Sequence, residues 1–367
     1  MIKVLSVFGT RPETIKMAPL VKELERREEI ESIVCVTGQH RQMLDQVLRA
    51  FDIHPDYDLN IMKPGQTLAG ITEAILQKME LVLETTTPDI VLVHGDTTTA
   101  FAAALSAFYH KIPVGHVEAG LRTYNKYSPY PEEVNRQFIS LVADMNFAPT
   151  QQSRQHLLDE GKDPDTIFVT GNTAIDALQL TVRPDYEDEI IRWAQGSRLI
   201  VLTAHRRENL GEPMRGMFRA IRRICEKYQD VKVVYPVHLN PVVVDAANEV
   251  FGNMDSVRLI QPLEVVEFHN LLARSYMILT DSGGIQEEAP SLHKPVIVLR
   301  DTTERPEGVQ AGTLRLAGTK EDDIYRMIDT LLCDPTQYDA MCKAENPYGD
   351  GQASVRIADA IIRRYNP

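Results

Sequence analysis

Two acidic side chains stand at the ends of short apolar segments, where carboxylates are placed to react with a bound group. Asp96 follows the segment 90–94, and Glu118 ends the segment 114–118. The N-cap of a helix beginning at Thr97 would also explain Asp96. Glu118 has no such explanation, because an acidic side chain that ends an apolar strand must be solvated, paired or functional.

A third acidic position opens a later helix. The segment 131–136 (PEEVNR) places Glu132 and Glu133 in the first helical turn. The positive end of the helix dipole stabilises an acidic residue there, so one of the two glutamates is explained without any function.

Cations flank the turn after the first apolar segment. Gly9 follows that segment, and Arg11 and Lys16 lie on either side of a predicted helix start at which Pro12 suits the first turn. A helix N-terminus flanked by two cations is a good anion site, although an ordinary strand-to-helix turn with two solvated cations also fits. No Gly-x-Gly-x-x-Gly fingerprint of a dinucleotide site is present.

Histidines and arginines follow strands in the second half of the chain. The segment 203–209 (TAHRREN) contains His205, Arg206 and Arg207, and His238 follows the segment 231–236. Histidines at strand ends could bind a metal, but no His-x-His or His-Glu-x-x-His spacing occurs. We therefore expect no metal.

A glycine-containing turn, 281–288 (DSGGIQEE), could bind phosphate. Its backbone N–H groups at 282–284 can approach a phosphate closely, and the dipole of the following helix adds attraction. Glu288 could accept hydrogen bonds from sugar hydroxyls or simply be solvated, and Arg305 is a further cation on a later loop. The first half thus offers carboxylates and the second a phosphate site. That division suggests a nucleoside diphosphate held by the second half while its attached group reacts against the first.

The elements that must position these residues alternate along the chain. Short apolar segments alternate with longer segments of helical period, which is the pattern of a parallel sheet covered by helices. The predicted strands are 4–8, 32–37, 90–94, 114–118, 145–148, 167–170, 199–203, 231–236, 257–260, 277–280 and 296–299. The predicted helices include 12–27, 68–85, 97–109, 132–143, 214–228, 285–291 and 353–365. We expect two doubly wound α/β units with ligands at the carboxyl ends of the strands, in a cleft between the units.

Length and composition bound the function. A chain of 367 residues suggests two domains, whose boundary we predict near Gly171. The formal net charge of −13 argues against a nucleic-acid or anionic-membrane binder. Four scattered cysteines without a Cys-x-x-Cys pair fit a reduced cytoplasm. The N-terminal apolar run has the length of a strand and lacks the features of a signal peptide, and no stretch is long enough to span a membrane.

Six segments carry a resemblance to a known family. They are 8–13 (FGTRPE), 94–96 (HGD), 116–122 (HVEAGLR), 131–136 (PEEVNR), 203–209 (TAHRREN) and 281–288 (DSGGIQEE). This set resembles the bacterial non-hydrolysing UDP-N-acetylglucosamine 2-epimerases. The resemblance implies a GT-B fold of two Rossmann-like domains, 1–170 and 171–352, with the helix in 353–367 returning to the first. It also implies a cytoplasmic homodimer that needs no cofactor. Its activity would interconvert UDP-N-acetylglucosamine and UDP-N-acetylmannosamine, supplying mannosamine units for cell-surface polysaccharide.

The resemblance also implies roles for individual residues. The family is taken to eliminate UDP across C1 and C2, giving a glycal, and to add it back with the proton on the other face. Carried over by motif, the catalytic residues are Asp96, Glu118, Glu132 and His205. The ligands of the UDP part would be Arg11, Lys16, Phe268, Ser282, Gly283, Gly284, Glu288 and Arg305. A second substrate molecule can act as an activator in the family, at positions that match Gln39, Gln42, Gln66, Arg206 and His238.

Three other functions stay open at this point. A GT-B glycosyltransferase would share the fold and the UDP site but require an acceptor. A hydrolysing epimerase would release N-acetylmannosamine and UDP. A nucleotide-sugar sensor would keep the fold and lose the catalysis. Three carboxylate motifs in the first half favour the epimerase.

Overall fold

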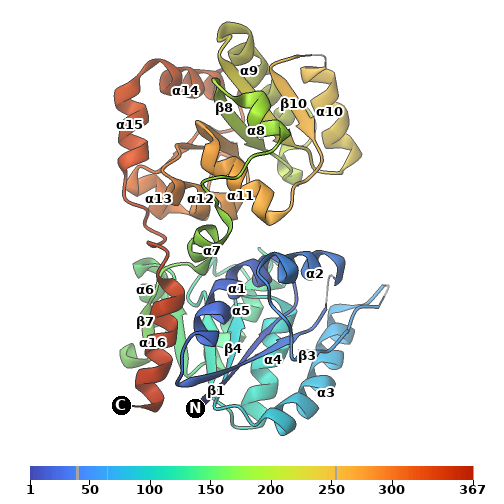
Figure 1. Cartoon of the computed structure of the whole chain (residues 1–367), viewed down its shortest axis with the longest axis vertical. Helices are drawn as coiled ribbons and strands as arrows, with labels where there is room; N and C mark the ends of the chain where they lie inside the picture. The colour runs from blue at the N-terminus through green and yellow to red at the C-terminus, as the bar shows by residue number, and fades with distance from the viewer. Residues whose placement is uncertain (39–40, 64, 253, 367) are drawn as a thin grey trace. The chain divides into compact units, whose positions relative to one another are not determined.

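The computed structural model describes residues 1–38, 41–63, 65–252 and 254–366, without the side chains of 41–43. By its internal contacts the chain forms two compact units. The first contains residues 1–180 and 348–367, and the second contains residues 181–347. Each unit has a parallel sheet with helices packed against it (Figure 1).

The first unit has a seven-stranded parallel sheet in the order β3-β2-β1-β4-β5-β6-β7. Its strands are β1 (Ile2–Phe8), β2 (Ile30–Val36), β3 (Tyr57–Asp58), β4 (Ile90–His94), β5 (Val114–Val117), β6 (Met145–Ala148) and β7 (Ile167–Val169). The strand order reverses between β1 and β4. At such a switch point the loops that follow the two strands diverge and leave room for a ligand.

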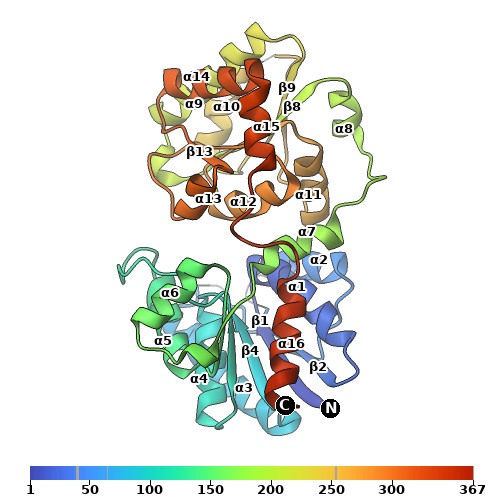
Figure 2. The ribbon, with the colours of Figure 1, turned by 90° about the vertical axis from the view of Figure 1, so that its left-hand side faces the viewer.

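The helices of the first unit cover this sheet. They are α1 (Arg11–Glu25), α2 (Arg41–Ala50), α3 (Leu68–Thr86), α4 (Thr98–Tyr109), α5 (Glu132–Val142), α6 (Gln151–Asp159), α7 (Thr173–Thr181) and α16 (Ala353–Tyr365). Buried side chains of α3 and α4 form one hydrophobic core with β1 and β4. Helix α16 packs along α1, as Figures 1 and 2 both show.

The second unit repeats this arrangement with six parallel strands in the order β10-β9-β8-β11-β12-β13. Its strands are β8 (Arg198–Thr203), β9 (Val231–Pro236), β10 (Val257–Ile260), β11 (Met277–Thr280), β12 (Val296–Val298) and β13 (Leu314–Leu316). Its helices are α8 (Glu189–Ala194), α9 (Glu212–Lys227), α10 (Pro241–Phe251), α11 (Val265–Arg274), α12 (Gly283–Glu288), α13 (Pro306–Ala311), α14 (Glu321–Cys333) and α15 (Pro335–Lys343). The order reverses between β8 and β11.

The predicted fold class is confirmed, since both units are doubly wound parallel sheets of the Rossmann type. All the predicted strands are present, with ends that differ by no more than two residues. The prediction lacked β3 and β13, which are edge strands of two and three residues. Such short strands carry too little hydrophobic pattern to be recognised.

The division into units differs from the predicted boundaries at 170 and 352. Residues 171–180 and 348–352 belong to the first unit. The segments 171–180 and 348–352 are joined directly, because Asn172 N donates to the carbonyl oxygen of Tyr348 at 2.8 Å. On α7, buried Asp176 accepts hydrogen bonds from the backbone N–H groups of Ala353 (3.2 Å) and Ser354 (2.7 Å). Asp176 thereby satisfies the first amides of α16 and holds that helix on the first unit.

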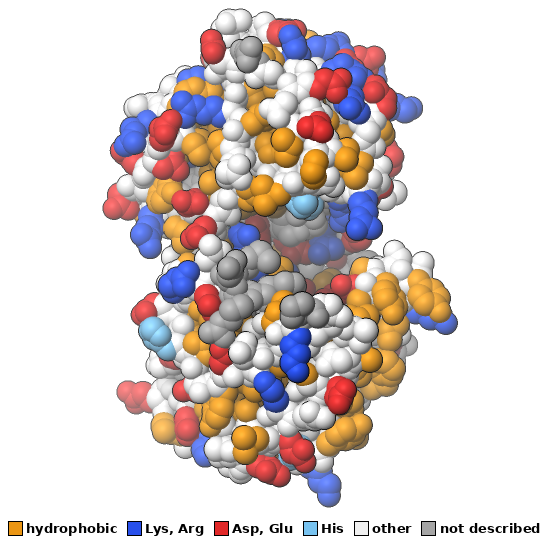
Figure 3. All heavy atoms as spheres, turned by 90° about the vertical axis from the view of Figure 1, so that its right-hand side faces the viewer, with side chains coloured by type: hydrophobic (Ala, Val, Ile, Leu, Met, Phe, Trp, Pro, Cys, Tyr) orange, Lys and Arg blue, Asp and Glu red, His pale blue; other side chains and the backbone are white. Residues whose placement is uncertain are grey.

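The charged side chains on the drawn face fit the prediction from net charge that the protein does not bind nucleic acid. On the face that Figure 3 draws, acidic and basic side chains are interspersed, without a basic stripe of the kind that binds nucleic acid. Among the described residues, no helix combines the length and the apolar character that crossing a bilayer requires.

Asp176→Ala should destabilise the protein by about 1–3 kcal/mol, because two buried N–H groups at the start of α16 lose their acceptor. Thermal and urea unfolding measure the change. Asp359→Ala is the control, because Asp359 makes a partly exposed ion pair between α16 and Arg27 (3.0 Å), and such a pair contributes at most about 1 kcal/mol. Equal losses in the two variants would contradict the capping role.

Candidate active site

Glu118 lies at the carboxyl edge of the first sheet, one residue beyond the end of β5. Its backbone φ of +66° is in the left-handed region, which is uncommon for a residue other than glycine. Its Oε2 atom forms an ion pair with Lys16 of α1 and accepts a hydrogen bond from Asn172 Nδ2 at 3.2 Å. Segments that are distant in the sequence thus hold one carboxylate in place.

His94, the last residue of β4, touches the same carboxylate. Its Nε2 atom lies 3.7 Å from Glu118 Oε2. Burial lowers the pKa of His94 to about 4, so the ring is neutral near pH 7 and the contact is not an ion pair. Glu118 Oε1 also lies 3.7 Å from where a Cβ on Gly95 would stand, and Gly95 directly precedes Asp96. Lys16, Glu118 and the turn that leads to Asp96 are therefore close together at the edge of the sheet.

Asp96 follows β4 and is bonded on both its side chain and its backbone. Its carboxylate forms an ion pair with Arg136, and its carbonyl oxygen accepts a hydrogen bond from Asn135 Nδ2 at 2.8 Å. Thr97, not Asp96, is the N-cap of α4, because its hydroxyl accepts from Ala100 N at 3.0 Å. The structural explanation that the sequence allowed for Asp96 is therefore wrong. Its side chain remains 24% exposed, within reach of a ligand.

The two glutamates that open α5 differ in their surroundings. Glu133 is fully buried and accepts hydrogen bonds from Thr123 N (3.0 Å), Tyr124 N (3.1 Å) and Gln137 Nε2 (2.8 Å). Burial alone would raise the pKa of Glu133, but these bonds and the charge of Arg136 lower it. Glu133 therefore holds the preceding loop. In Glu132, by contrast, Oε2 is buried without a hydrogen-bond partner among the described residues, which leaves that oxygen for another group.

The turn that carries Arg11 is fixed by Glu13. This buried carboxylate accepts from Gly9 N (3.1 Å), Thr10 N (2.8 Å) and the hydroxyl of Thr97 (2.6 Å). It therefore ties the loop after β1 to the loop after β4. Burial raises the pKa of Glu13, although these hydrogen bonds oppose the rise. A Cβ atom at Gly9 would collide with the Thr37 hydroxyl, so the close approach of the chain here requires glycine.

In the second unit, a buried aspartate organises the switch point between β8 and β11. Asp281 Oδ2 accepts from His205 N and Arg206 N, both at 2.9 Å, and from Asn209 Nδ2 at 3.2 Å. The imidazole of His205 is 45% exposed and stacks on that of His238, with 5.6 Å between the ring centroids. The histidine segment and the glycine-containing turn, which are predicted to bind diphosphate, are thus neighbours.

The glycine-containing turn has a cation and a carboxylate beside it. Arg305 forms an ion pair through Nε with buried Glu287, and its guanidinium carbon lies 3.8 Å from where a Cβ on Gly283 would stand. Glu288 Oε2 lies 3.7 Å from Nε2 of His269. Ser282 and Gly284 flank Gly283 at the start of α12, and half-buried Phe268 packs on the core beneath.

The positions matched to an activator site are divided between the units. Gln66 accepts from Lys63 N at 2.8 Å in the first unit. Arg206 contacts Glu208 (3.3 Å) and Glu304 (3.5 Å) in the second unit, where His238 also lies. Gln39 and the side chain of Gln42 lie outside the described residues.

Sequence reasoning did not select Arg136, Asn172 or His94. Arg136 and His94 lie inside the recognised segments, close in sequence to the selected carboxylates. That closeness was the only sequence signal for their place in the site. Glu13 carried a stronger one, because Thr10 and Glu13 have the spacing of a capping box and form one. Asn172 could not be found, because its partner Glu118 is fifty-four residues away in the chain.

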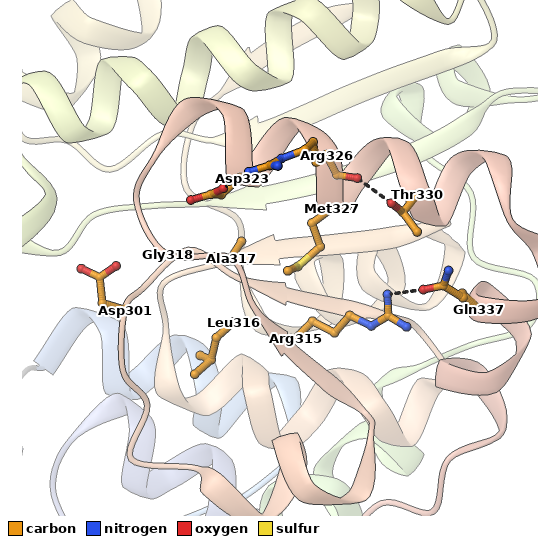
Figure 4. A pocket seen from close by; sticks show the side chains of 10 residues that line it. All are labelled: Asp301, Arg315, Leu316, Ala317, Gly318, Asp323, Arg326, Met327, Thr330 and Gln337. Carbon is orange, nitrogen blue, oxygen red and sulfur yellow. Dashed lines mark hydrogen bonds and ion pairs between the residues drawn. The ribbon is translucent and has the colours of Figure 1, made fainter.

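Two other features lie apart from the predicted site. A pocket of about 640 Å³ beside β13 and α14 is lined by none of the predicted residues (Figure 4). Its arginines are engaged, Arg315 with Gln337 at 2.9 Å and Arg326 with Asp323. Among the described residues, one group has the spacing to hold a metal ion, namely Glu80, Glu84 and His110 on α3 and at the end of α4. Neither feature includes a predicted site residue, although Asp301 at the pocket lies on the loop after β12 that also carries Arg305.

Comparisons with known proteins agree with this arrangement. The sequence model of the family described as UDP-N-acetylglucosamine 2-epimerase matches residues 22–362. The UDP-N-acetylglucosamine 2-epimerase of Bacillus subtilis is 63% identical over 364 residues, covering 99% of this chain and 96% of its own.

Solved structures give the same result. A crystal structure of UDP-N-acetylglucosamine 2-epimerase superposes with a TM-score of 0.93 at 61% identity, covering 99% of this chain and 96% of the other. The enzyme from Neisseria meningitidis, solved bound to UDP-N-acetylglucosamine, has a TM-score of 0.88 at 50% identity and covers 99% and 100% of the two chains. The chain belongs to the UDP-N-acetylglucosamine 2-epimerase family.

Proposed function

We propose that the protein interconverts UDP-N-acetylglucosamine and UDP-N-acetylmannosamine by eliminating UDP and adding it back. The observation that carries this proposal is that Asp96, after β4, and Glu118, after β5, lie at the same edge of the sheet, each paired with a cation, with Glu118 Oε1 3.7 Å from where a Cβ on Gly95 would stand. The family to which the chain belongs supports the substrate.

The reaction needs more than one carboxylate. A base removes the proton from C2, the electrons of that C–H bond form the C1=C2 double bond, and the C1–O bond breaks with its electron pair leaving on UDP. Re-addition returns UDP to C1 and a proton to the opposite face of C2. Asp96, Glu118 and Glu132 are the groups that we assign to these proton transfers. No single fixed side chain reaches both faces of the sugar, so a set of acids and bases is required.

The second unit is assigned to the UDP part. The backbone at Gly283 and Gly284 offers N–H donors, and the guanidinium of Arg305 lies beside Gly283. The N–H of Ser282 already donates to Thr280 Oγ1 at 3.0 Å, so Ser282 would contribute its hydroxyl. His205 would contact the diphosphate, and Glu288 and Phe268 would contact the nucleoside. From the first unit, the cations Arg11 and Lys16 would stabilise the charge that develops on departing UDP.

A second substrate molecule is proposed as an activator through Arg206 and His238. Arg206 adjoins His205 on the loop after β8, and His238, on the loop after β9, stacks on the His205 ring. Binding there would act directly on a residue that we assign to the diphosphate. The remaining positions of this proposed site are Gln39, Gln42 and Gln66.

A homodimer is proposed through the first unit. Large apolar side chains on α3, α4 and α5 are between 49% and 73% exposed, namely Leu81, Phe108, Tyr109, Phe138 and Leu141. Figure 3 shows hydrophobic side chains gathered along one margin of this unit. The three helices are packed neighbours, so these side chains form an apolar patch of the kind that a partner covers.

Replacing single carboxylates should greatly lower turnover without loss of nucleotide binding. In deuterated water with UDP-N-acetylglucosamine alone, the wild type should place deuterium at C2, as nuclear magnetic resonance detects. Asp96→Asn, Glu118→Gln and Glu132→Gln should each lower kcat about 10²- to 10⁴-fold, because each removes an acid or base. Calorimetry should show UDP affinity retained.

Glu84→Gln is the matched control, because Glu84 is exposed on α3 away from the strand ends, and its kcat should equal that of the wild type. The other functions give different results. A glycosyltransferase would need an acceptor, a hydrolysing epimerase would accumulate UDP, and a sensor would show no C2 exchange in the wild type.

Arg305→Ala should weaken UDP binding about 10- to 100-fold, which corresponds to losing one charge-assisted hydrogen bond to phosphate. Arg305→Lys keeps a cation beside Glu287 and should lose less. Titration calorimetry measures both. Arg326→Ala is the control, because Arg326 lines the pocket of Figure 4 instead of the glycine-containing turn. A greater loss of UDP affinity in Arg326→Ala than in Arg305→Ala would indicate that the nucleotide binds in that pocket.

Leu141→Glu should convert a dimer into monomers, because it places a charge in the apolar patch. Light scattering coupled to gel filtration gives the mass of each species. Leu239→Glu provides the comparison, since Leu239 is similarly exposed on the second unit. A wild-type monomer, or a variant that remains a dimer, would rule out this interface.

A further inference from the structure

His116 is a buried histidine to which the proposed reaction gives no role. It lies on β5, two residues before Glu118, and is fully buried. Its Nε2 atom donates a hydrogen bond to the carbonyl oxygen of Gly95 at 2.8 Å. Gly95 directly precedes Asp96 in the chain. The imidazole therefore joins the strand that leads to Glu118 to the turn that leads to Asp96.

The Gly95 peptide is held by β5 on both sides. Its N–H group donates to the carbonyl oxygen of Val117 at 2.9 Å, and its carbonyl group is held by His116. With a φ of +65°, Gly95 adopts a conformation that other residues seldom accept. Glu118 Oε1 lies 3.7 Å from where a Cβ on Gly95 would stand. The turn is thus pressed against the strand end that carries Glu118.

The second ring nitrogen of His116 is without a partner. Burial lowers the pKa of His116 to about 3, so the ring is neutral near pH 7. Because Nε2 carries the proton that Gly95 accepts, Nδ1 is a bare acceptor. Nδ1 is buried and bonded to no group in the described part of the chain. A buried acceptor without a hydrogen bond costs stability, so we expect a donor to bind Nδ1.

Asn146 lies on the adjacent strand and has a side-chain N–H group without an acceptor among the described residues. Strand β6 pairs with β5 so that Asn146 is the register partner of His116. Register partners on adjacent strands point to the same face of a sheet. The Asn146 side chain is fully buried, and within the described residues neither its nitrogen nor its oxygen has a hydrogen-bond partner. A donor without an acceptor therefore adjoins an acceptor without a donor.

We propose that His116 and Asn146 form one positioning pair for the reaction. The Asn146 amide donates to His116 Nδ1, directly or through one buried water. This bond fixes the tautomer in which Nε2–H holds the Gly95 carbonyl, and it thereby sets the distance between Asp96 and Glu118. The inference rests on the proposed function, because it assigns the pair the task of holding two of its carboxylates.

Replacement of His116 tests the pair. In His116→Gln, a side-chain amide can still donate to Gly95, whereas His116→Leu fills a similar space and donates nothing. His116→Leu should lower kcat about 10- to 100-fold, because small displacements of reacting groups have effects of this size. KM and UDP affinity should stay unchanged, and His116→Gln should recover most of the rate.

A matched control separates positioning from a general effect of losing a histidine. His110 also bonds through its ring to a backbone carbonyl, that of Ser106 at 2.9 Å, but it does so at the end of α4. His110→Leu should keep the wild-type kcat. A loss of folded protein would also lower the apparent kcat at unchanged KM. Thermal unfolding and the stoichiometry of UDP binding by calorimetry therefore have to show that each variant is fully folded, and kcat is calculated per UDP-binding site.

A double-mutant cycle tests whether Asn146 acts through His116. Asn146→Leu should lower kcat by itself at unchanged KM, and it should add no loss in the His116→Leu background. If His116→Leu does not fold, Asn146→Leu alone decides, because it removes the donor and leaves the ring in place. Independent losses, or a wild-type kcat in either single variant, would overturn the proposal.

Failure of the proposed function would look different. If Asp96→Asn keeps the wild-type rate of C2 exchange, the assignment of the carboxylates fails, and the pair has nothing to position. If Asp96→Asn is inactive while His116→Leu keeps its rate, only the positioning pair is wrong.

Discussion

In each unit, one buried carboxylate holds together the two loops that diverge at the switch point of the sheet. Glu13 accepts from the loop after β1 and from Thr97 on the loop after β4. Asp281, on the loop after β11, accepts from two backbone amides on the loop after β8. Backbone N–H groups buried at strand ends need acceptors. The two units meet this requirement at the same place in the topology, although they use residues from opposite sides of the switch.

This arrangement explains why charged groups gather where an apolar sheet ends. Once the loops are fixed, the side chains that they carry have defined neighbours, and Lys16 and Arg136 each contact a carboxylate of another segment. A set of charges that is held before a ligand arrives does not have to reorganise during a reaction. The positions of these charged side chains depend on which segments the loops bring together. They do not depend on the net charge of the whole chain.

Much of this structure could be predicted from the sequence, but not all of it. Apolar segments and turn residues located the strands, and six short segments located the loops that carry Asp96, Glu118, His205 and the glycine-containing turn. Patterns of single residues could not separate Glu132 from Glu133, because that difference depends on which one meets the amides of Thr123 and Tyr124. Contacts such as that of Asn172 with Glu118 arise only after both segments have folded onto the same edge.

The first unit is assembled from two stretches of chain that are separated by the whole second unit. Helix α16 packs on α1 and contributes Ile357 and Ile361, both fully buried, so the core of this unit is incomplete until that helix has joined it. Residues 181–347 form a continuous segment with its own core and need no such closure. During translation the first unit can therefore be completed only after all residues of the second unit have been made, the reverse of the usual N-terminal-first order.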